Sequence, residues 1–407
     1  MQKTRQFGPA DLETAAACIQ RGELVAVPTE TVYGLAGNGL NADAVAEIYK
    51  VKGRPETKPL SLMVSSWEDI AKYCRNVPKA AYVLAERFWP GPLTLIFESR
   101  PCVPEIVRAG GTTVGLRCPQ HDMTLELIRR AGCPLAAPSA NPSNAPSPKT
   151  AQQVLDYFDG CIAGVIDGGL CELGLESTIL DLSQIPYRVL RQGALPRERI
   201  VRCLTEHMQV VGLTGGSGCG KTTALHCLSD HGALIVDCDT LYHNLLEENA
   251  ELLAAIDDRF PGVVTDHGLE RKALGGLVFQ DAAALDDLNA ITHRYVSAAI
   301  RTLLEDWAMQ GGALAAIDAI ALFESGLAEL CTVTVGVTAP MESRMQRLTV
   351  RDGISEEYAR MRIAAQQPDS FFETNCDYML YNNGSLSKFT KVCDGLFTEL
   401  LGGIDHV

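Results

Sequence analysis

The sequence predicts an α/β protein built from two domains, and three observations support this. Its 407 residues are too many for one ordinary domain and suit two of about 200 residues each. Apolar runs of strand length alternate with helical segments in both halves. A glycine-rich loop at 215–222 lies between a β-branched run and a helical segment, half-way along the chain. We therefore expect a mixed twisted sheet in residues 1–203 and a parallel sheet in residues 209–407.

Charge and cysteine usage restrict the function classes. The first 207 residues hold 22 of the 35 Lys and Arg and 22 of the 50 Asp and Glu, so the whole net charge of −15 lies in the second half. An acidic half is a poor candidate for non-specific nucleic-acid binding, whereas the neutral first half leaves that question open. The 14 cysteines are scattered without a C-x-x-C pair, which predicts reduced thiols and neither a zinc site nor a redox motif. With no signal-peptide core and no membrane-spanning run, we expect a cytoplasmic protein without membrane contact.

The first half alternates strands and helices in chain order. Asp11 can cap a helix over residues 12–21 that stops at Gly22, and residues 24–27 then form a buried strand ending at Pro28. The same patterns predict strands at 60–64, 93–97, 114–117, 135–137, 162–166 and 178–182, with helices at 42–51, 78–88 and 123–131.

Polar clusters follow several of these strands, which is where sheets present chemistry. Four cationic residues fall close together, namely Lys50, Lys52, Arg54 and Lys58. A solvated basic loop is the simpler explanation for such a run of charge. The segment Ser139-Ala140-Asn141-Pro142 can equally be a turn. Neither cluster alone establishes a site.

Together and in this order, these segments resemble the threonylcarbamoyl-AMP synthase (YrdC-like) family over roughly residues 8–191. The resemblance implies an enzyme that joins L-threonine, bicarbonate and ATP into threonylcarbamoyl-AMP and pyrophosphate, the first step of a tRNA adenosine modification. The macromolecular partners of the first half would then be tRNA-modification proteins, and it would make weak contact with RNA. The matching motifs are Pro28-Thr29-Glu30-Thr31-Val32-Tyr33-Gly34-Leu35, Lys52-x-Arg54, Trp89-Pro90-Gly91-Pro92-Leu93-Thr94, Gly115-Leu116-Arg117, Ser139-x-Asn141 and Glu176-Ser177-Thr178.

The same resemblance implies the site residues of the first half. Threonine carbamate must attack the α-phosphorus while pyrophosphate leaves, so crowded negative groups need fixed cations and donors. The implied catalytic residues are Lys52 and Arg54. The other implied contacts to ATP or threonine are Thr31, Tyr33, Arg117, Ser139, Asn141, Ser177 and Arg191.

An alternative for the first half is a YrdC-like domain that binds RNA or has a regulatory role without catalysis. The second half would then supply the only activity of the chain.

The second half begins with a charged helix at 197–207 and a strand at 209–213, which leads into the phosphate-binding loop. In this spacing, backbone N–H groups surround phosphate oxygens, the lysine reaches the outer phosphates and the hydroxyl holds Mg²⁺. We expect the whole segment to bind ATP: Gly215, Gly216, Ser217, Gly218, Cys219, Gly220, Lys221, Thr222 and Thr223. Further strands are predicted at 233–236, 313–317 and 333–337, and helices at 251–260, 271–279 and 293–309.

Charged side chains follow the strands of this half. Asp237 and Asp239 come directly after a strand and could meet a hydroxyl acceptor and Mg²⁺, although both could simply cap a helix. Asp318 ends another strand, where a second carboxylate can orient Mg²⁺ directly or through water. Arg344, Arg347 and Arg351 are spaced three and four apart, hence on one helical face. Because like charges on one face repel, we expect phosphates to occupy it beneath a lid.

This half resembles dephospho-CoA kinase from residue 210 to about 401. The resemblance implies a helical substrate region, a lid, and transfer of the ATP γ-phosphoryl group to the ribose 3′-hydroxyl of dephospho-CoA. It implies catalytic roles for Lys221, Asp239 and Arg347, acceptor binding by Asp237, and phosphate binding by Arg351. The matching segments are Gly212-Leu213-Thr214-Gly215-Gly216, Lys221-Thr222, Asp237-x-Asp239, Asp318, Leu322-Phe323-Glu324, Arg347-Leu348, Arg351-Asp352, Arg362-Ile363-Ala364-Ala365-Gln366 and Asn383-Gly384-Ser385. A phosphate-loop ATPase or GTPase switch is a more distant alternative.

Overall fold

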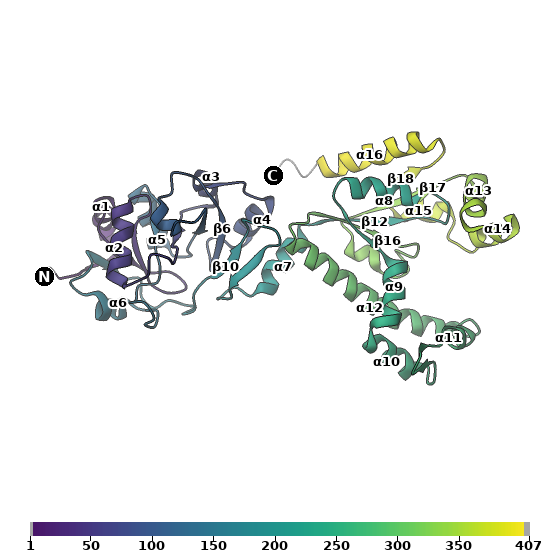
Figure 1. Cartoon of the computed structure of the whole chain (residues 1–407), viewed down its shortest axis with the longest axis horizontal. Helices are drawn as coiled ribbons and strands as arrows, with labels where there is room; N and C mark the ends of the chain where they lie inside the picture. The colour runs from purple at the N-terminus through teal and green to yellow at the C-terminus, as the bar shows by residue number, and fades with distance from the viewer. Residues whose placement is uncertain (1–2, 403–407) are drawn as a thin grey trace. The chain divides into compact units, whose positions relative to one another are not determined.

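The computed structural model describes residues 3–402, which divide into two compact units (Figure 1). The first unit holds the chain through Glu206 together with Met309–Gly311. The second holds His207–Ala308 and the chain from Gly312 onward. Residues 1–2 and 403–407, at the ends of the two expected domain ranges, lie outside the described residues.

The first unit contains a mixed β-sheet, which confirms the predicted sheet type. It combines parallel pairs, such as β4 (Ser61–Met63) with β7 (Thr113–Arg117), and antiparallel pairs, such as β6 (Leu93–Ser99) with β7. β5 (Cys74–Arg75) pairs with β6 at one side. Along the sheet the order is β1 (Arg5–Phe7), β9 (Gly164–Ile166), β2 (Val25–Val27), β3 (Gly34–Asn38), β8 (Leu135–Ala136), β4 (Ser61–Met63), β7 (Thr113–Arg117), β6 (Leu93–Ser99), β10 (Thr178–Asp181) and β11 (Arg188–Arg191).

Helices pack against this sheet. Leu12 and Ile19 of α1 share a buried cluster with Leu127 and Ile128 of α5, so the apolar faces of the two helices close one core. The helices of the unit are α1 (Leu12–Gln20), α2 (Ala42–Lys52), α3 (Ile70–Tyr73), α4 (Lys79–Phe88), α5 (Asp122–Ala131), α6 (Ala151–Phe158) and α7 (Arg197–Glu206).

Some local predictions for this unit were wrong. The Asp11 carboxylate accepts the Gly8 N–H (2.9 Å) instead of capping α1, because a short 3₁₀ turn precedes the helix. The helix α6, whose N-terminus is capped by the Thr150 hydroxyl, was not predicted. The helix α2 ends at Lys52, one residue beyond the predicted end, because Gly53 adopts a left-handed φ of 58°.

The second unit has a five-stranded sheet in which every neighbouring pair is parallel, as predicted. The helices α8 (Lys221–Asp230) and α16 (Leu386–Gly402) pack together, and their apolar side chains join those of the strands in one core. The strand order is β13 (Leu234–Asp237), β16 (Leu314–Asp318), β12 (Gln209–Thr214), β17 (Val333–Thr338) and β18 (Tyr378–Tyr381).

Helices extend from this sheet in two groups (Figure 1). The first group has its own apolar core and includes the small hairpin of β14 (Val264–Thr265) and β15 (Gly268–Leu269). Its helices are α9 (Cys238–Glu248), α10 (Ala250–Arg259), α11 (Arg271–Val278) and α12 (Ala282–Met309). The second group, which we call the lid region, comprises α13 (Met341–Asp352), α14 (Glu356–Ala364) and α15 (Asp369–Asn375).

Two helix predictions in this unit were wrong. α12 begins at Ala282, eleven residues before the expected start, because its first turns pack Ala284 and Leu288 into the core of the helical group. α9, which begins between the two acidic residues Asp237 and Asp239, was missed by the prediction. Within residues 3–402, no helix is both long enough and apolar enough to cross a membrane.

Candidate active sites

The phosphate-binding loop lies between β12 and α8, as the sequence predicted. Gly215 has a φ of +134°, and a Cβ there would lie 2.2 Å from the Val337 carbonyl oxygen. Gly220 has a φ of +111° just before α8 begins at Lys221. Both positions therefore require glycine, because a side chain would clash or strain the backbone.

Carbonyl groups of the loop are bonded to side chains. Lys221 Nζ donates to the Gly215 oxygen at 3.0 Å. Arg347 Nη1 donates to the Gly218 oxygen (3.0 Å) and the Cys219 oxygen (3.2 Å), and Asn382 Nδ2 also donates to Cys219 (2.9 Å). Pinning the carbonyls in this way orients the peptide planes, which is what a cradle of N–H groups requires.

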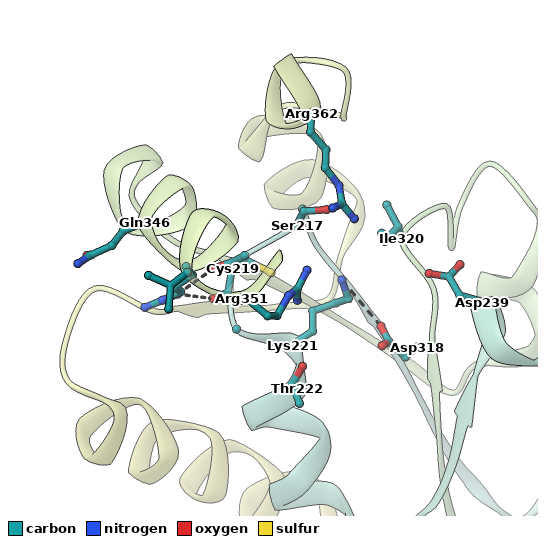
Figure 2. A pocket seen from close by; sticks show the side chains of 15 residues that line it. Ser217, Cys219, Lys221, Thr222, Asp239, Asp318, Ile320, Gln346, Arg351 and Arg362 are labelled. Atoms are coloured by element: carbon teal, nitrogen blue, oxygen red, sulfur yellow. Dashed lines mark hydrogen bonds and ion pairs between the residues drawn. The ribbon is translucent and has the colours of Figure 1, made fainter. Parts of the chain in front are cut away.

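A pocket of about 610 Å³ lies in front of the loop (Figure 2). It is large enough for a nucleotide and is open to solvent. Three predicted site residues, Gly215, Thr223 and Asp237, do not line it. The predicted residues that do are Gly216, Ser217, Gly218, Cys219, Gly220, Lys221, Thr222, Asp239, Asp318, Arg347 and Arg351, joined by Ile320, Gln346, Val350 and Arg362, which were not predicted.

Asp318 lies at the end of β16, beside Leu213 of β12 and Asp237 of β13 in the parallel register. Its Oδ1 lies 4.0 Å from Lys221 Nζ and is buried without a hydrogen-bond partner. Burial raises the pKa of the Asp318 carboxyl to about 6, partly offset by Lys221. A buried oxygen without a donor, in a pocket that the Thr222 side chain also lines, fits a bound divalent cation.

The two carboxylates after β13 have different surroundings. Asp237 Oδ1 accepts the Thr240 N–H (3.0 Å) and so caps α9. Asp239 lies one residue into α9 and faces the pocket from the side opposite the lid region (Figure 2). The geometry therefore separates a helix cap from a carboxylate that can meet a substrate.

The three arginines of α13 do not form one open cationic face. Arg344 is buried, and Arg347 bonds to loop carbonyls. Arg351 is paired with Asp352 (2.6 Å), which also binds Arg362 (2.9 Å). Each charge thus has an acceptor within the protein, so the expected repulsion is relieved even without phosphates.

The first unit contains a second pocket, lined from several strands of its sheet. Six of the nine predicted site residues line it, whereas Tyr33, Lys52 and Asn141 do not. Thr94 and Glu176 also line it and were not predicted as site residues, although both stand in segments of the family resemblance. The six are Thr31, Arg54, Arg117, Ser139, Ser177 and Arg191.

Lys52 and Asn141 hold the wall of this pocket. Lys52 is 3% exposed, and its Nζ donates to the carbonyl oxygens of Ser139 and Asn141. Burial, together with Arg54, lowers the pKa of Lys52 to about 8. The Asn141 amide donates to the Pro142 oxygen (3.0 Å) and the Ala145 oxygen (2.7 Å), so both side chains shape the 139–145 loop.

Arg117 is fixed by a buried carboxylate. Its Nη2 lies 2.8 Å from Glu30 Oε2 and 2.9 Å from Thr31 Oγ1. Glu30 is 4% exposed and does not line the pocket. Behind the same segment, the Tyr33 hydroxyl donates to the Gly169 oxygen (2.8 Å), and burial raises the pKa of Tyr33 to about 12. Tyr33 thus braces a loop of the site from inside the core.

Arg191 and Ser177 line the same pocket. Arg191 donates to the Ser177 carbonyl oxygen (3.0 Å) and hydroxyl (3.2 Å), and it is paired with Glu176. Thr94 shares a hydrogen bond with the Ser177 hydroxyl (2.8 Å). Arg54 donates to the carbonyl oxygens of Lys58 and Pro59, and burial lowers its pKa. Guanidinium groups and hydroxyls are the donors that phosphate binding uses.

Family comparisons assign the two halves separately. Residues 17–193 match the family Sua5_yciO_yrdC, described as "Telomere recombination", and residues 209–388 match the family CoaE, described as "Dephospho-CoA kinase". Together the two matches account for most of the chain.

Three relatives illustrate the similarity. The chain is 45% identical over 195 residues to the threonylcarbamoyl-AMP synthase of Pyrococcus abyssi, covering 48% of this chain and 57% of the relative. It is 37% identical over 208 residues to a putative threonylcarbamoyl-AMP synthase of Mycobacterium tuberculosis, covering 49% and 95%. It is 38% identical over 198 residues to the dephospho-CoA kinase of Anaeromyxobacter dehalogenans, covering 48% and 94%.

The coverage differs between relatives. The chain spans little more than half the length of the synthases from Pyrococcus abyssi and Bacillus subtilis, 57% and 54% respectively. It spans nearly all of the shorter synthase relative and of the kinase. The chain therefore belongs to two families, the Sua5/YciO/YrdC family through its first half and the dephospho-CoA kinase family through its second.

Proposed function

We propose that this chain is a bifunctional enzyme whose halves, residues 1–203 and 209–407, use ATP at separate sites. The second half transfers the γ-phosphoryl group of ATP to the ribose 3′-hydroxyl of dephospho-CoA, which yields coenzyme A and ADP. The first half converts L-threonine, bicarbonate and ATP into L-threonylcarbamoyl-AMP and pyrophosphate. The observation that carries the kinase assignment is the single pocket shared by the phosphate-binding loop, Asp239 and Asp318.

In the kinase site, the residues have distinct proposed roles. Asp239 accepts the proton of the 3′-hydroxyl, whose oxygen bonds to the γ-phosphorus while the bond to the β-phosphate oxygen breaks. Lys221 stabilises the charge that accumulates between the β- and γ-phosphates. Arg347 and Arg351 approach the phosphates from the lid region, and Asp237 fixes the start of α9 so that Asp239 faces the pocket.

Thr222 and Asp318 would hold Mg²⁺, the usual partner of ATP. The buried, unpartnered Asp318 Oδ1 supports this choice, because an oxygen without a donor is suited to a hard cation. When bound, the ion would neutralise part of the phosphate charge. Lys221, whose Nζ lies 4.0 Å from Asp318 Oδ1, is positioned for the same task.

In the synthase site, the carbamate oxygen of N-carboxythreonine bonds to the α-phosphorus while the bond to pyrophosphate breaks. Arg54, Arg117 and Arg191 would stabilise the negative charge, and Ser177 would donate to a phosphate or the ribose. Thr31 and Ser139 would position threonine and its carbamate. Lys52, Asn141 and Tyr33 support the pocket wall, so their contribution is proposed to be indirect.

The alternative for the first half is an RNA-binding or regulatory domain without catalysis. The arginines and hydroxyls gathered on one pocket favour catalysis, because RNA binding alone would not require them to converge there. The synthase names of the relatives support the same choice. Threonylcarbamoyl-AMP would then pass to tRNA-modification proteins, with at most weak RNA contact by this domain. The proposed location is the cytoplasm, where the substrates of both reactions are available and cysteine thiols stay reduced.

Product analysis tests both assignments. Purified protein with ATP and Mg²⁺ should release pyrophosphate only when threonine and bicarbonate are both present. It should form ADP and coenzyme A only when dephospho-CoA is present. Absence of threonine-dependent pyrophosphate would favour the non-catalytic alternative for the first half, and absence of coenzyme A would refute the kinase assignment.

A further inference from the structure

Ser217, within the phosphate-binding loop, is held by two side chains from the lid region. Gln366, two residues beyond α14, accepts the Ser217 backbone N–H with Oε1 (2.8 Å), and its Nε2 donates to Ser217 Oγ (2.8 Å). Arg344 of α13 donates from Nε to the Ser217 carbonyl oxygen (3.0 Å). Arg344 Nη2 also donates to Gln366 Oε1 (3.2 Å). The N–H, carbonyl and hydroxyl of one loop residue are therefore all bonded to this pair.

The contact is closely packed. Ser217 and Arg344 are each 6% exposed. A Cβ at Gly216 would lie 2.0 Å from Arg344 Nη2 and 3.0 Å from Gln366 Oε1, so only glycine leaves room for the pair. The charge of Arg344 is balanced by Asp369, 3.5 Å away on α15. Arg344 is thus a buried, charge-compensated part of the fold, and Gln366 beside it is partly buried.

The pair acts on the loop from behind. Ser217 lines the pocket in front of the loop (Figure 2). Arg344 and Gln366 are not among the residues that line it. A phosphate-binding loop needs peptide planes whose N–H groups converge on the anion, and any carbonyl that turns inward would repel it. Because the Ser217 carbonyl oxygen accepts a hydrogen bond from Arg344, the peptide cannot turn that oxygen toward the phosphates.

We infer that Gln366 and Arg344 are positioning residues that fix the Ser217 peptides in the phosphate-binding conformation. This inference rests on the proposed kinase function and assigns a role to the glutamine of the Ala364-Ala365-Gln366 segment. It predicts that the pair determines ATP affinity without contact to the nucleotide. A purely structural role would instead change thermal stability and leave ATP affinity unaltered.

The test is Gln366→Met in the full-length protein, with Gln367→Met as the matched control. The control residue is adjacent in sequence but bonds to Glu324, outside the loop. ATP is titrated by calorimetry without dephospho-CoA, and the component that Lys221→Ala removes is assigned to the loop. We expect about tenfold weaker ATP binding for Gln366→Met, equivalent to roughly one net hydrogen bond, and a matching rise in KM for ATP. The KM for dephospho-CoA and the behaviour of the control should not change.

A double-mutant cycle separates the effect of Gln366 on ATP binding from any general loss of folded protein. Ser217→Ala removes only the hydroxyl bond and should weaken ATP binding by about threefold. In the Gln366→Met background it should have no further effect, because its partner is already absent. Wild-type ATP affinity in folded Gln366→Met, or fully additive losses in the double variant, would overturn the inference. If wild-type protein binds ATP at this loop but forms no coenzyme A, the kinase assignment fails while this test remains valid.

Discussion

Replacing Asp318 with asparagine should stabilise the second unit although it removes phosphoryl transfer. The Asp318 side chain is 20% exposed, and burial raises the pKa of its carboxyl to about 6 from an ordinary value of 3.8. A difference of this size corresponds to roughly 3 kcal/mol of destabilisation by the ionised carboxylate at pH 7. Because the asparagine amide also needs hydrogen-bond partners, we expect a net gain of about 1–2 kcal/mol.

The pH dependence of this gain has a definite sign. The folded-state pKa of Asp318 lies above its unfolded value, so the folded protein binds more protons between pH 3.8 and about 6. The stability of the wild-type protein therefore falls as pH rises through this window, and the full destabilisation by the ionised Asp318 carboxylate is present at pH 7. At pH 4.5 the destabilisation by Asp318 falls to about a third, roughly 1 kcal/mol, which does not exceed the penalty of the asparagine amide, so the net advantage of Asp318→Asn should vanish there.

Scanning calorimetry with EDTA and without nucleotide measures the effect directly. For a unit of this size, a gain of 1–2 kcal/mol should raise Tm by about 3–6 °C at pH 7. Coenzyme A formation should fall by about 100-fold or more, because the carboxylate is proposed to hold the Mg²⁺ that neutralises phosphate charge. A lowered Tm, or a gain of equal size at pH 4.5 and pH 7, would refute the reasoning.

Three further substitutions test other parts of the account. Glu30→Gln leaves the buried Arg117 charge without its partner, so it should destabilise the first unit by about 2–3 kcal/mol and slow pyrophosphate formation at least about tenfold. Burial lowers the pKa of Lys52 to about 8, so the free-energy cost of keeping its ammonium group charged in the folded protein decreases as pH rises. The free energy of unfolding of the wild type, measured with urea, should therefore increase by about 1.3 kcal/mol relative to that of Lys52→Met between pH 7 and 9. Asp352→Asn removes the ion pairs that hold Arg351 and Arg362 in place. Because exposed ion pairs add little stability, Tm should change by less than about 1 °C, whereas KM for ATP should rise about threefold because the two arginines are no longer fixed.

Matched variants control these measurements. Glu172→Gln and Glu342→Gln remove exposed carboxylates in the first unit and on α13, and neither should change stability or activity. Unchanged pyrophosphate formation in Glu30→Gln would contradict the role given to the buried pair. A stability difference for Lys52→Met that does not vary with pH, or an unaltered KM for Asp352→Asn, would contradict the other two.

The sequence predicts best those features whose geometry is local. The phosphate-binding loop has one conformation that suits its glycine spacing, so residues 215–222 could be assigned without knowledge of tertiary contacts. The parallel and mixed sheets follow from the alternation of strands and helices, and the structure confirms both. Strand ends were placed within one or two residues, since apolar runs mark buried strands well.

The features that sequence analysis missed depend on distant contacts. Gln366 meets Ser217 across 149 positions, and no local pattern indicates that partner. Lys52 and Arg54 look equivalent in sequence, yet one is buried against carbonyl groups and the other lines the pocket. Asp237 and Asp239 differ only in their place relative to the start of α9, so composition could not tell the cap from the pocket residue.

The most direct test of the central claim is to assay both reactions in one preparation of Lys221→Ala. The account predicts that coenzyme A formation is lost, because the ammonium group beside the phosphates is absent. It also predicts that threonine- and bicarbonate-dependent pyrophosphate release continues at the wild-type rate, since the other pocket contains no part of this loop. Loss of both activities in the folded variant, or retention of coenzyme A formation, would contradict the proposal of two separate ATP sites.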